Sequence, residues 1–350
     1  MSKNKKVKFG LVPPVPGTEL KDLIQFVRKC ESAGFDSNWF PDHILFMADR
    51  ITPEVWSVIT GASVVSEKIH MGAIGDPHRI HPAVFAHRLA TIDNLSGGRV
   101  FSCLGYGEKM NLDYYGIPWN KPLSRLKESV QIIKKLLKGN IVNFDGEFFK
   151  LRNAEIRIRP HNGESVPIYI AATGPRALSV AGEIGDGWIT NAMPDHLYAK
   201  KLHKVNEGFK KRDDKTEFES GIYIFLSVSE NYDDAYSTLD SIKHAIIWPE
   251  LLSEAGYDIK IDEKFDGLEY TKIMPSDKQM ISKFREMGSQ YYSREILEDF
   301  VICGTPGDIR ASLERYIDAG VDHFILRDFS PDRDYSFNVL SKDILPYFKK

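Results

Sequence analysis

The chain has very little cysteine and no excess of charge of either sign. Its 350 residues include three cysteines, and 46 basic side chains nearly balance 49 acidic ones, for a formal net charge of −3. The cysteines lie far apart and form no Cys-x-x-Cys pair, which excludes a disulfide framework or a zinc module and favours a reducing cytoplasm. The balanced charge provides no field to hold nucleic acid or an anionic membrane, so we expect neither partner.

Long apolar runs and internal repeats are also missing. No segment reaches the roughly 20 apolar residues that a membrane helix needs, and the basic start MSKNKKVKFGLVPP has no continuous apolar stretch typical of a signal peptide. No repeat with a period of about 20–50 residues is visible, which excludes solenoids and propellers. With 42% hydrophobic and 27% charged residues, the composition is that of a soluble globular enzyme.

The remaining pattern is an alternation of short apolar strands and amphipathic helices. The predicted strands are Val7–Val12, Ser37–Pro41, Ile69–Ile74, Arg99–Gly105, Pro167–Ala172, Gly187–Asn191, Gly221–Ser229 and His323–Asp328. The predicted helices are Glu19–Ala33, Pro53–Ser66, Pro82–Leu95, Leu123–Leu137, Pro175–Ile184, His196–Lys211, one from Asp233, Thr305–Ala319 and a terminal helix to Phe348.

Eight strands with intervening helices predict an α/β fold of the (β/α)₈ TIM-barrel class, as a single domain over residues 1–350. A doubly wound sheet is the alternative, but the first strand is followed by ValProProValProGly instead of a Gly-x-Gly-x-x-Gly loop. Two segments fall outside the alternation. Residues 139–166 contain a predicted hairpin, Ile141–Leu151, which turns at Asp145-Gly146, and residues 248–292 are polar and aromatic without a clear period.

Active sites of such barrels lie at the carboxyl ends of the strands, so polar residues there are the first functional candidates. They are Asp42, His43, Asp76, His78, Glu108, Asn111, Thr173 and Gly174. Asp42 and His43 suit general acid/base chemistry because a carboxylate can fix the tautomer of a neighbouring imidazole. The backbone after Thr173 opens a helix and could receive a phosphate.

Each of these motifs also has a purely structural interpretation. An isolated AspHis can be a capped turn, and GlyTyrGlyGlu can be an ordinary turn from strand to helix. ThrGlyPro can be a capped helix start, and His78, Arg79 and His81 fit a solvated helix entrance better than an anion site. A metal site of Asp42, His43 and His78 is disfavoured because no HExxH or comparable ligand pair occurs.

Several segments in fixed order nevertheless resemble one known superfamily. They are AGFDSNWFPDH, HRIHPAVFAHRLATIDNLSGGRV, GYGEKMNLDYYGIPWNKPLSRLKESV, VPIYIAATGPRALSVAGEIGDGWITN and CGTPGDIRASLERYIDAGVDHFILRD. Together they resemble the luciferase-like superfamily and, within it, the oxidoreductases that depend on coenzyme F420, an 8-hydroxy-5-deazaflavin. The resemblance runs from Val7 to the terminal helix, with about Trp248–Tyr292 unmatched, and implies a barrel whose mouth holds the deazaflavin.

The resemblance also implies residue roles. His43 matches the acid/base that serves the substrate oxygen, and Glu108 matches the carboxyl group that handles the proton at the deazaflavin ring. The peptide between Ala73 and Ile74 falls where the family has a non-prolyl cis bond against the central ring. The other positions that match cofactor contacts are Asp42, Asp76, Tyr106, Gly107 and Asn111 around the ring, and Thr173 and Gly174 at the phosphate-bearing tail.

Departures from the family pattern bear on the substrate. Asn191–Pro194 stand where sugar-phosphate members have a phosphate-binding lysine. Leu11 and Val12 stand where the pterin reductase has a glutamate. Ile44–Met47 stand where the dehydrogenases have a tryptophan, and only Phe46 and Met47 offer a large side chain there. We therefore expect hydride transfer with a carbonyl/alcohol or pterin-like substrate.

Two other functions stay open. One is a monooxygenase that uses reduced FMN, and the other is a barrel that only binds a flavin or a partner protein. A homodimer is expected, with Val55, Trp56, Ile59, Val84 and Phe85 as one possible contact face; packing of these residues on the barrel is an equal alternative.

Overall fold

Eight parallel strands of the described chain close into a barrel. The computed structural model describes residues 6–14, 19–46, 52–163, 165–213 and 216–349. The barrel strands are β1 (Lys8–Leu11), β2 (Ser37–Pro41), β3 (His70–Gly75), β4 (Val100–Leu104), β7 (Ile168–Ala171), β8 (Gly187–Asn191), β9 (Glu219–Val228) and β11 (His323–Asp328). They pair in this order, and β11 pairs back with β1, which closes the ring. The predicted TIM barrel is confirmed, and each predicted barrel strand overlaps an observed one.

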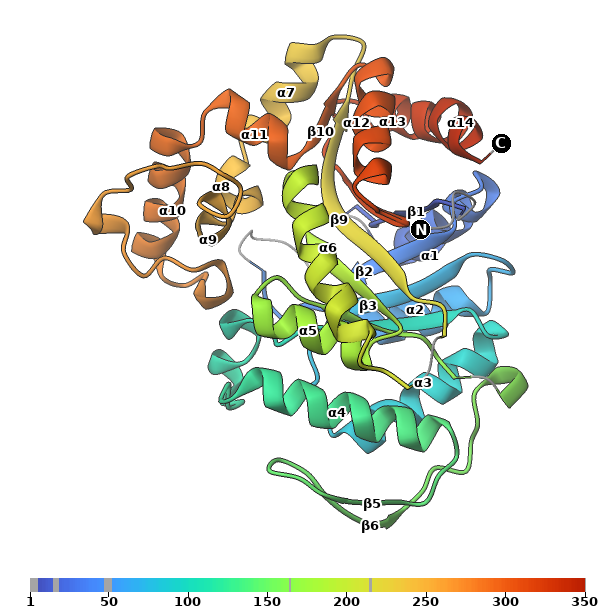
Figure 1. The fold of residues 1–350 in the computed structure, drawn as a ribbon. Coiled ribbons are helices and arrows are strands. Elements are labelled where there is room, and N and C mark those ends of the chain that lie inside the picture. Colours follow the sequence, from blue (N-terminus) through green and yellow to red (C-terminus); the bar gives the residue numbers. More distant parts are fainter. Residues whose placement is uncertain (1–5, 15–18, 47–51, 164, 214–215, 350) are drawn as a thin grey trace.

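Helices surround the barrel (Figure 1). They are α1 (Leu20–Ser32), α2 (Val55–Ser63), α3 (Pro82–Ser96), α4 (Pro122–Leu137), α5 (Pro175–Ile184), α6 (Asp195–Phe209), α7 (Tyr232–Asp240), α12 (Pro306–Asp318), α13 (Arg333–Val339) and α14 (Leu345–Phe348). Local chemistry sets several of their ends. Pro82 opens α3 and Gly97 ends it in the left-handed region at φ 69°, while Thr305 and Asp308 form a capping box on α12.

Side chains alternate between the barrel interior and the helical layer, as the period of a strand requires. The interior cluster is built around Trp39, Phe101 and Tyr169, with the Trp39 and Phe101 ring centroids 4.3 Å apart. Gly10 makes room for this cluster, because a Cβ there would lie 2.4 Å from the Ser37 hydroxyl oxygen and 2.7 Å from the Trp39 ring. The filled interior leaves the carboxyl end of the strands as the place for a site.

Two segments extend the barrel. The strands β5 (Val142–Asp145) and β6 (Lys150–Ala154) form the hairpin that the sequence predicted. This hairpin lies below α4 in Figure 1. The second segment, residues 243–304, holds α8 (Lys243–Ile246), α9 (Pro249–Leu252), α10 (Lys278–Tyr291), α11 (Arg294–Phe300) and β10 (Ile302–Gly304), which pairs with the upper half of β9. We call residues 243–292 the excursion; it lies to the left of the barrel in Figure 1.

Contacts from several parts of the barrel fasten the excursion, among them two involving side chains of the turn η2 (Asp113–Tyr115) and of α6. The backbone N–H of Ser276 donates to the Tyr114 hydroxyl at 3.0 Å, and Lys201 of α6 forms a 2.7 Å ion pair with Glu254. No helix in the described part of the chain combines the length and apolar character needed to cross a membrane.

Candidate active site

A cavity of about 740 Å³ lies at the carboxyl end of the barrel, between the strand ends and the excursion. This volume is in the range of small-molecule sites. Nine of the eleven predicted site residues line it: Asp42, His43, Ile74, Asp76, Tyr106, Gly107, Glu108, Asn111 and Thr173. Ala73 and Gly174 are not among the lining residues. The structure thus brings most of the sequence candidates to one place.

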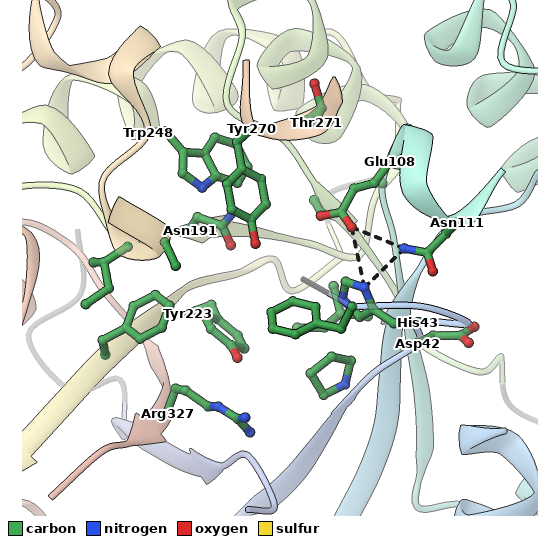
Figure 2. A pocket seen from close by; sticks show the side chains of 18 of the residues that line it. Asp42, His43, Glu108, Asn111, Asn191, Tyr223, Trp248, Tyr270, Thr271 and Arg327 are labelled. Carbon is green, nitrogen blue, oxygen red and sulfur yellow. Dashed lines mark hydrogen bonds and ion pairs between the residues drawn. The ribbon is translucent and has the colours of Figure 1, made fainter. Parts of the chain in front are cut away.

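His43, Glu108 and Asn111 form one connected group on the wall supplied by β2 and β4 (Figure 2). The Asn111 amide nitrogen donates to His43 Nδ1 at 3.1 Å and to Glu108 Oε2 at 3.3 Å, and His43 Nδ1 lies 3.5 Å from Glu108 Oε2. The His43 and Glu108 side chains are 16% and 24% exposed. Phe46 closes one side, with its ring 5.0 Å from that of His43 in an edge-to-face arrangement, while Met47 lies outside the described residues.

This environment moves the two titratable groups in opposite directions. Burial raises the pKa of Glu108 to about 7, helped by the charge of Asp76 and opposed by Arg79 and the Asn111 hydrogen bond. Burial lowers the pKa of His43 to about 4, against the attraction of Asp42. At neutral pH the imidazole is therefore neutral, and the carboxyl group titrates much closer to neutrality than an ordinary glutamate.

Arg79 joins the ends of β2 and β3. Its guanidinium contacts Asp76 Oδ2 through Nε at 3.0 Å, Asp42 Oδ1 through Nη1 at 3.1 Å and the Asp42 carbonyl through Nη2 at 2.9 Å. The Arg79 side chain is 14% exposed. The sequence analysis favoured a solvated helix entrance that includes Arg79. For Arg79 this interpretation is wrong, because its side chain is recessed between two carboxylates. In Figure 2 the Asp42 carboxylate points away from Glu108 and Tyr223.

The Ala73–Ile74 peptide corrects one expectation. The described residues contain no cis peptide bond, so the cis bond expected here is wrong. The strand is regular at this point, because Ala73 and Ile74 are in register with Phe40 and Pro41 of β2 and with Ser102 and Cys103 of β4. Ala73 is buried in the outer, helix-facing core, while Ile74 lines the cavity.

The loops after the neighbouring strands β4 and β7 lie side by side at the cavity. Gly107 has φ 82°, and a Cβ there would lie 3.1 Å from the His78 ring and 3.2 Å from Asp76 Cβ, so only glycine fits without strain. Tyr106 is hydrogen-bonded to Thr173, and burial raises the pKa of its hydroxyl. Beneath Thr173, the ammonium group of the buried Lys201 donates to the Thr173 carbonyl at 2.9 Å.

His78 lies next to the loop after β4. Its Nε2 lies 3.0 Å from the Tyr106 carbonyl oxygen, and burial lowers its pKa. Within the described ranges, no group of three or more His, Cys, Asp or Glu side chains is arranged to hold a metal ion.

The opposite wall holds residues that the sequence analysis missed or named only in passing. Asn191, Tyr223 and Arg327 come from β8, β9 and β11, and Trp248 stacks on Tyr270 of the excursion with centroids 4.7 Å apart (Figure 2). The polar candidates named from the sequence lie at the ends of the second to fifth strands. The same rule applied to the last three strands would have pointed to Asn191 and Arg327.

Comparison with known proteins agrees with this geometry. The model of the luciferase-like monooxygenase family matches residues 8–323. The chain belongs to this family. It is 29% identical to the 5,10-methylenetetrahydromethanopterin reductase of Archaeoglobus fulgidus, over 98% of this chain and 100% of that one. It is 27% identical to the F420-dependent glucose-6-phosphate dehydrogenase of Amycolatopsis mediterranei, over 93% of this chain and 94% of that one.

Solved structures show the same fold. An F420-dependent secondary alcohol dehydrogenase in complex with an F420–acetone adduct superposes with a TM-score of 0.83 at 23% identity, over 99% of this chain and 100% of that one. The F420-dependent tetrahydromethanopterin reductase of Methanopyrus kandleri has a TM-score of 0.81 at 24% identity, over 98% and 100%.

Proposed function

We propose that this protein is a coenzyme F420-dependent oxidoreductase that transfers a hydride between the deazaflavin and a carbonyl/alcohol or pterin-like substrate. One observation carries the proposal: His43 and Glu108 share Asn111 on the wall of a 740 Å³ cavity at the barrel mouth. Support also comes from relatives of nearly equal length whose names specify F420 or a pterin reductase.

The residues of the cavity fit a planar ring system with a polar tail. Ile74 and Ala171 supply apolar surface, and the backbone of Gly105 and Gly107 carries no side chain that would narrow the space. Near the opening, no heavy atom lies within 4 Å of the position that a Cβ on Gly174 would take. We propose that Asp42, Ile74, Asp76, Tyr106, Gly107 and Asn111 surround the ring and that Thr173 and Gly174 hold the tail. The cofactor contact expected for Ala73 is wrong, because Ala73 lies on the helix-facing side of β3.

Glu108 is the group suited to move a proton. When bound, reduced F420 supplies a hydride, so conversion of a carbonyl to an alcohol needs one further proton. A carboxyl group with a pKa of about 7 can give or take that proton at neutral pH.

His43 has a different role in this proposal from the acid/base role that the family resemblance implies. Its Nδ1 accepts from Asn111, so the neutral ring carries its proton on Nε2. We propose that this Nε2–H donates a hydrogen bond to the substrate oxygen and polarises the carbonyl. Glu108 then gives that oxygen its proton during reduction and takes the proton back during alcohol oxidation.

Titration of the purified protein with reduced F420 and, separately, with reduced FMN tests the proposal. Cofactor fluorescence and absorbance report binding, and oxidation of reduced F420 in the presence of a panel of ketones, aldehydes and a methylene-pterin reports turnover. We expect binding of F420 and consumption of at least one acceptor. Binding of FMN alone, with oxygen consumption, would instead support the monooxygenase alternative.

We further propose that the protein acts in the cytoplasm, where its three buried, unpaired cysteines stay reduced.

We also propose that two copies of the chain associate. Most of the expected contact face is buried within the chain, namely Val55, Trp56, Ile59 and Phe85, whereas Val84 is 55% exposed. Sedimentation velocity at micromolar concentration should show twice the 39.8 kDa chain mass, and a species of single mass would contradict the dimer.

A further inference from the structure

Trp248 and Tyr270 of the excursion form a stacked aromatic pair at the cavity. Their ring centroids lie 4.7 Å apart, and the ring planes differ by 17°. Both residues line the cavity, and Tyr270 is 9% exposed. The backbone N–H of Tyr270 donates to Glu250 Oε1 at 3.0 Å, which holds the turn that carries the ring. The pair therefore presents a fixed, planar apolar surface to the cavity.

This stacked pair lies close to the proposed reacting groups. The turn η5 (Tyr270–Lys272) packs against the turn η1 (Lys109–Asn111) in the loop after β4. Burial raises the pKa of the Tyr270 hydroxyl well above its ordinary value, and the charge of Glu108 adds to the shift. Figure 2 shows the stacked pair on the side of the cavity opposite His43. A substrate whose carbonyl faces His43 and Glu108 therefore places its body against the pair.

Strand β9 and the end of β11 add three more aromatic rings to this part of the cavity, those of Tyr223, Phe225 and Phe329. The ring centroids of Tyr223 and Phe225 lie 5.9 Å apart, and those of Phe225 and Phe329 lie 5.7 Å apart. Aromatic rings gain free energy from stacked and edge-to-face contacts beyond the burial of apolar area. These walls therefore favour a planar aromatic ring over a saturated ring of similar size.

Asn191 and Tyr223 supply a polar pair within these walls. They are partners in register on β8 and β9, so their side chains stand next to each other on the same side of the sheet. Both line the cavity, and within the described ranges neither the Asn191 amide nor the Tyr223 hydroxyl has a hydrogen bond to another protein group. The amide carries no charge, and burial raises the pKa of the Tyr223 hydroxyl above its ordinary value. A neutral ligand group that both donates and accepts, as a hydroxyl does, satisfies both side chains.

We propose that the substrate is an aryl ketone or aryl aldehyde that carries a hydroxyl group on its ring. The ring lies against the stacked pair of the excursion, and the ring hydroxyl binds Asn191 and Tyr223. The carbonyl then faces His43 and Glu108. This substrate class rests on the proposed function, whereas binding of the aryl ring and its hydroxyl requires only the cavity.

Calorimetric titration of the protein with bound oxidised F420 tests the proposal, because the oxidised cofactor cannot transfer a hydride to a ketone. The probes are 4-hydroxyacetophenone, acetophenone, cyclohexyl methyl ketone and 4-acetylbenzoate, and each is also added to the protein without F420. We expect acetophenone to bind about 5–10-fold more tightly than cyclohexyl methyl ketone, because only the aryl ring can stack. The hydroxyl group of 4-hydroxyacetophenone should add about another tenfold.

Two variants separate the contributions of the ring and of its hydroxyl. Tyr223→Phe should weaken binding of 4-hydroxyacetophenone about tenfold and leave acetophenone unchanged, because only the phenol contact is lost. Trp248→Leu should remove most of the preference for acetophenone over cyclohexyl methyl ketone and leave F420 binding unchanged. Should Trp248→Leu not fold, Tyr270→Leu replaces it with the same expectation. Tyr347→Phe is the matched control, because Tyr347 is 43% exposed on α14, away from the cavity; it should change none of the affinities.

Equal affinity for acetophenone and cyclohexyl methyl ketone in the natural protein would overturn the proposal, as would unchanged binding of 4-hydroxyacetophenone in Tyr223→Phe. Weaker F420 binding in Trp248→Leu would assign the stacked pair to the cofactor and overturn it as well. Tighter binding of 4-acetylbenzoate than of 4-hydroxyacetophenone would overturn the hydroxyl in favour of a carboxylate.

The same titrations distinguish failure of this proposal from failure of the proposed function. Binding of 4-hydroxyacetophenone that depends on Tyr223, without any F420 binding, would refute the proposed function and leave the aryl pocket intact. F420 binding with turnover of saturated ketones alone would refute the aryl substrate and leave the proposed function intact.

Discussion

Asn111 fixes the protonation of His43. The Asn111 side-chain oxygen accepts from the backbone N–H groups of Ile44 at 2.8 Å and Leu45 at 3.1 Å, so its amide nitrogen must face the imidazole. That nitrogen donates to His43 Nδ1 at 3.1 Å. A proton on Nδ1 would oppose this donor, which agrees with the low pKa of His43. The loop after β4 thus determines which nitrogen of His43, in the loop after β2, carries the proton.

Replacing this donor should reverse the arrangement. In Asn111→Asp one carboxylate oxygen can still accept from the two backbone groups, while the other becomes an acceptor facing Nδ1. We expect the pKa of His43 to rise from about 4 and a proton to appear on Nδ1. Nitrogen NMR of the labelled imidazole measures both changes. Asn111→Leu removes the donor without adding charge and should raise the pKa less; an unchanged spectrum in both variants would contradict the assignment.

Glu108→Gln should leave F420 bound and slow hydride transfer by about 10²–10⁴-fold, the usual loss when a general acid or base is removed. In the natural protein, carbonyl reduction needs the protonated acid, so its rate should fall as pH rises through about 7, and alcohol oxidation should show the opposite slope. Single-turnover absorbance at several pH values measures this. A variant that keeps both its rate and its pH profile would remove Glu108 from the mechanism.

The sequence predicts the barrel well because each strand is a short apolar run ended by a glycine, proline or polar residue. It does not predict α10, where only Phe284, Met287 and Gly288 are buried over 14 residues. Such a narrow apolar face is hard to recognise among polar neighbours, although Ile281, Phe284 and Gly288 do have helical spacing. The position of the excursion also depends on distant contacts such as Tyr114 with Ser276 and Lys201 with Glu254.

For the site, strand ends locate His43, Glu108 and Asn111 together, because parallel strands bring their carboxyl ends to one edge. Arg79 contacts Asp76 only three residues away, but its contact with Asp42 joins the loop after β3 to the loop after β2, and no local pattern encodes that contact. The wall made by Arg327 and Trp248 combines residues 79 positions apart in the sequence, so only the closed barrel and the excursion reveal it.

Asp42 and Arg79 should act as one unit. If Asp42 serves the cofactor through this pairing, Asp42→Asn and Arg79→Met should weaken F420 binding to the same extent. Arg79→Met should lower the free energy of unfolding by about 3 kcal/mol because the recessed carboxylates of Asp42 and Asp76 both lose their cation, and Asp42→Asn should lower it less because Arg79 keeps its pair with Asp76. F420 titration and urea unfolding measure the two effects. Asp145→Asn, in the exposed pair with Lys150, is the control and should change neither. Weaker binding in Asp42→Asn alone would indicate direct contact with the cofactor, as the family resemblance implies.

The closed base of the barrel should make stability depend on pH through Glu219. Its carboxylate contacts His323 Nδ1 at 2.6 Å and Lys8, and His323 Nε2 lies 2.7 Å from the Ser37 hydroxyl oxygen. Burial alone would raise the pKa of Glu219, but His323 and Lys8 together hold it well below its ordinary value.

Because the folded state favours the ionised form, this contribution to stability is present above the ordinary glutamate pKa of about 4.3 and is lost as pH falls below it. Glu219→Gln should therefore lower the free energy of unfolding by about 3 kcal/mol at pH 7, where His323 loses its buried partner. The difference in the free energy of unfolding between the natural protein and Glu219→Gln should become smaller as the pH approaches 3. Urea unfolding at pH 7, 5, 4 and 3 measures the trend, with Glu155→Gln, in the exposed pair with Arg157, as the control. A difference in the free energy of unfolding that stays constant over this range would show that His323 and Lys8 do not stabilise the ionised form of Glu219.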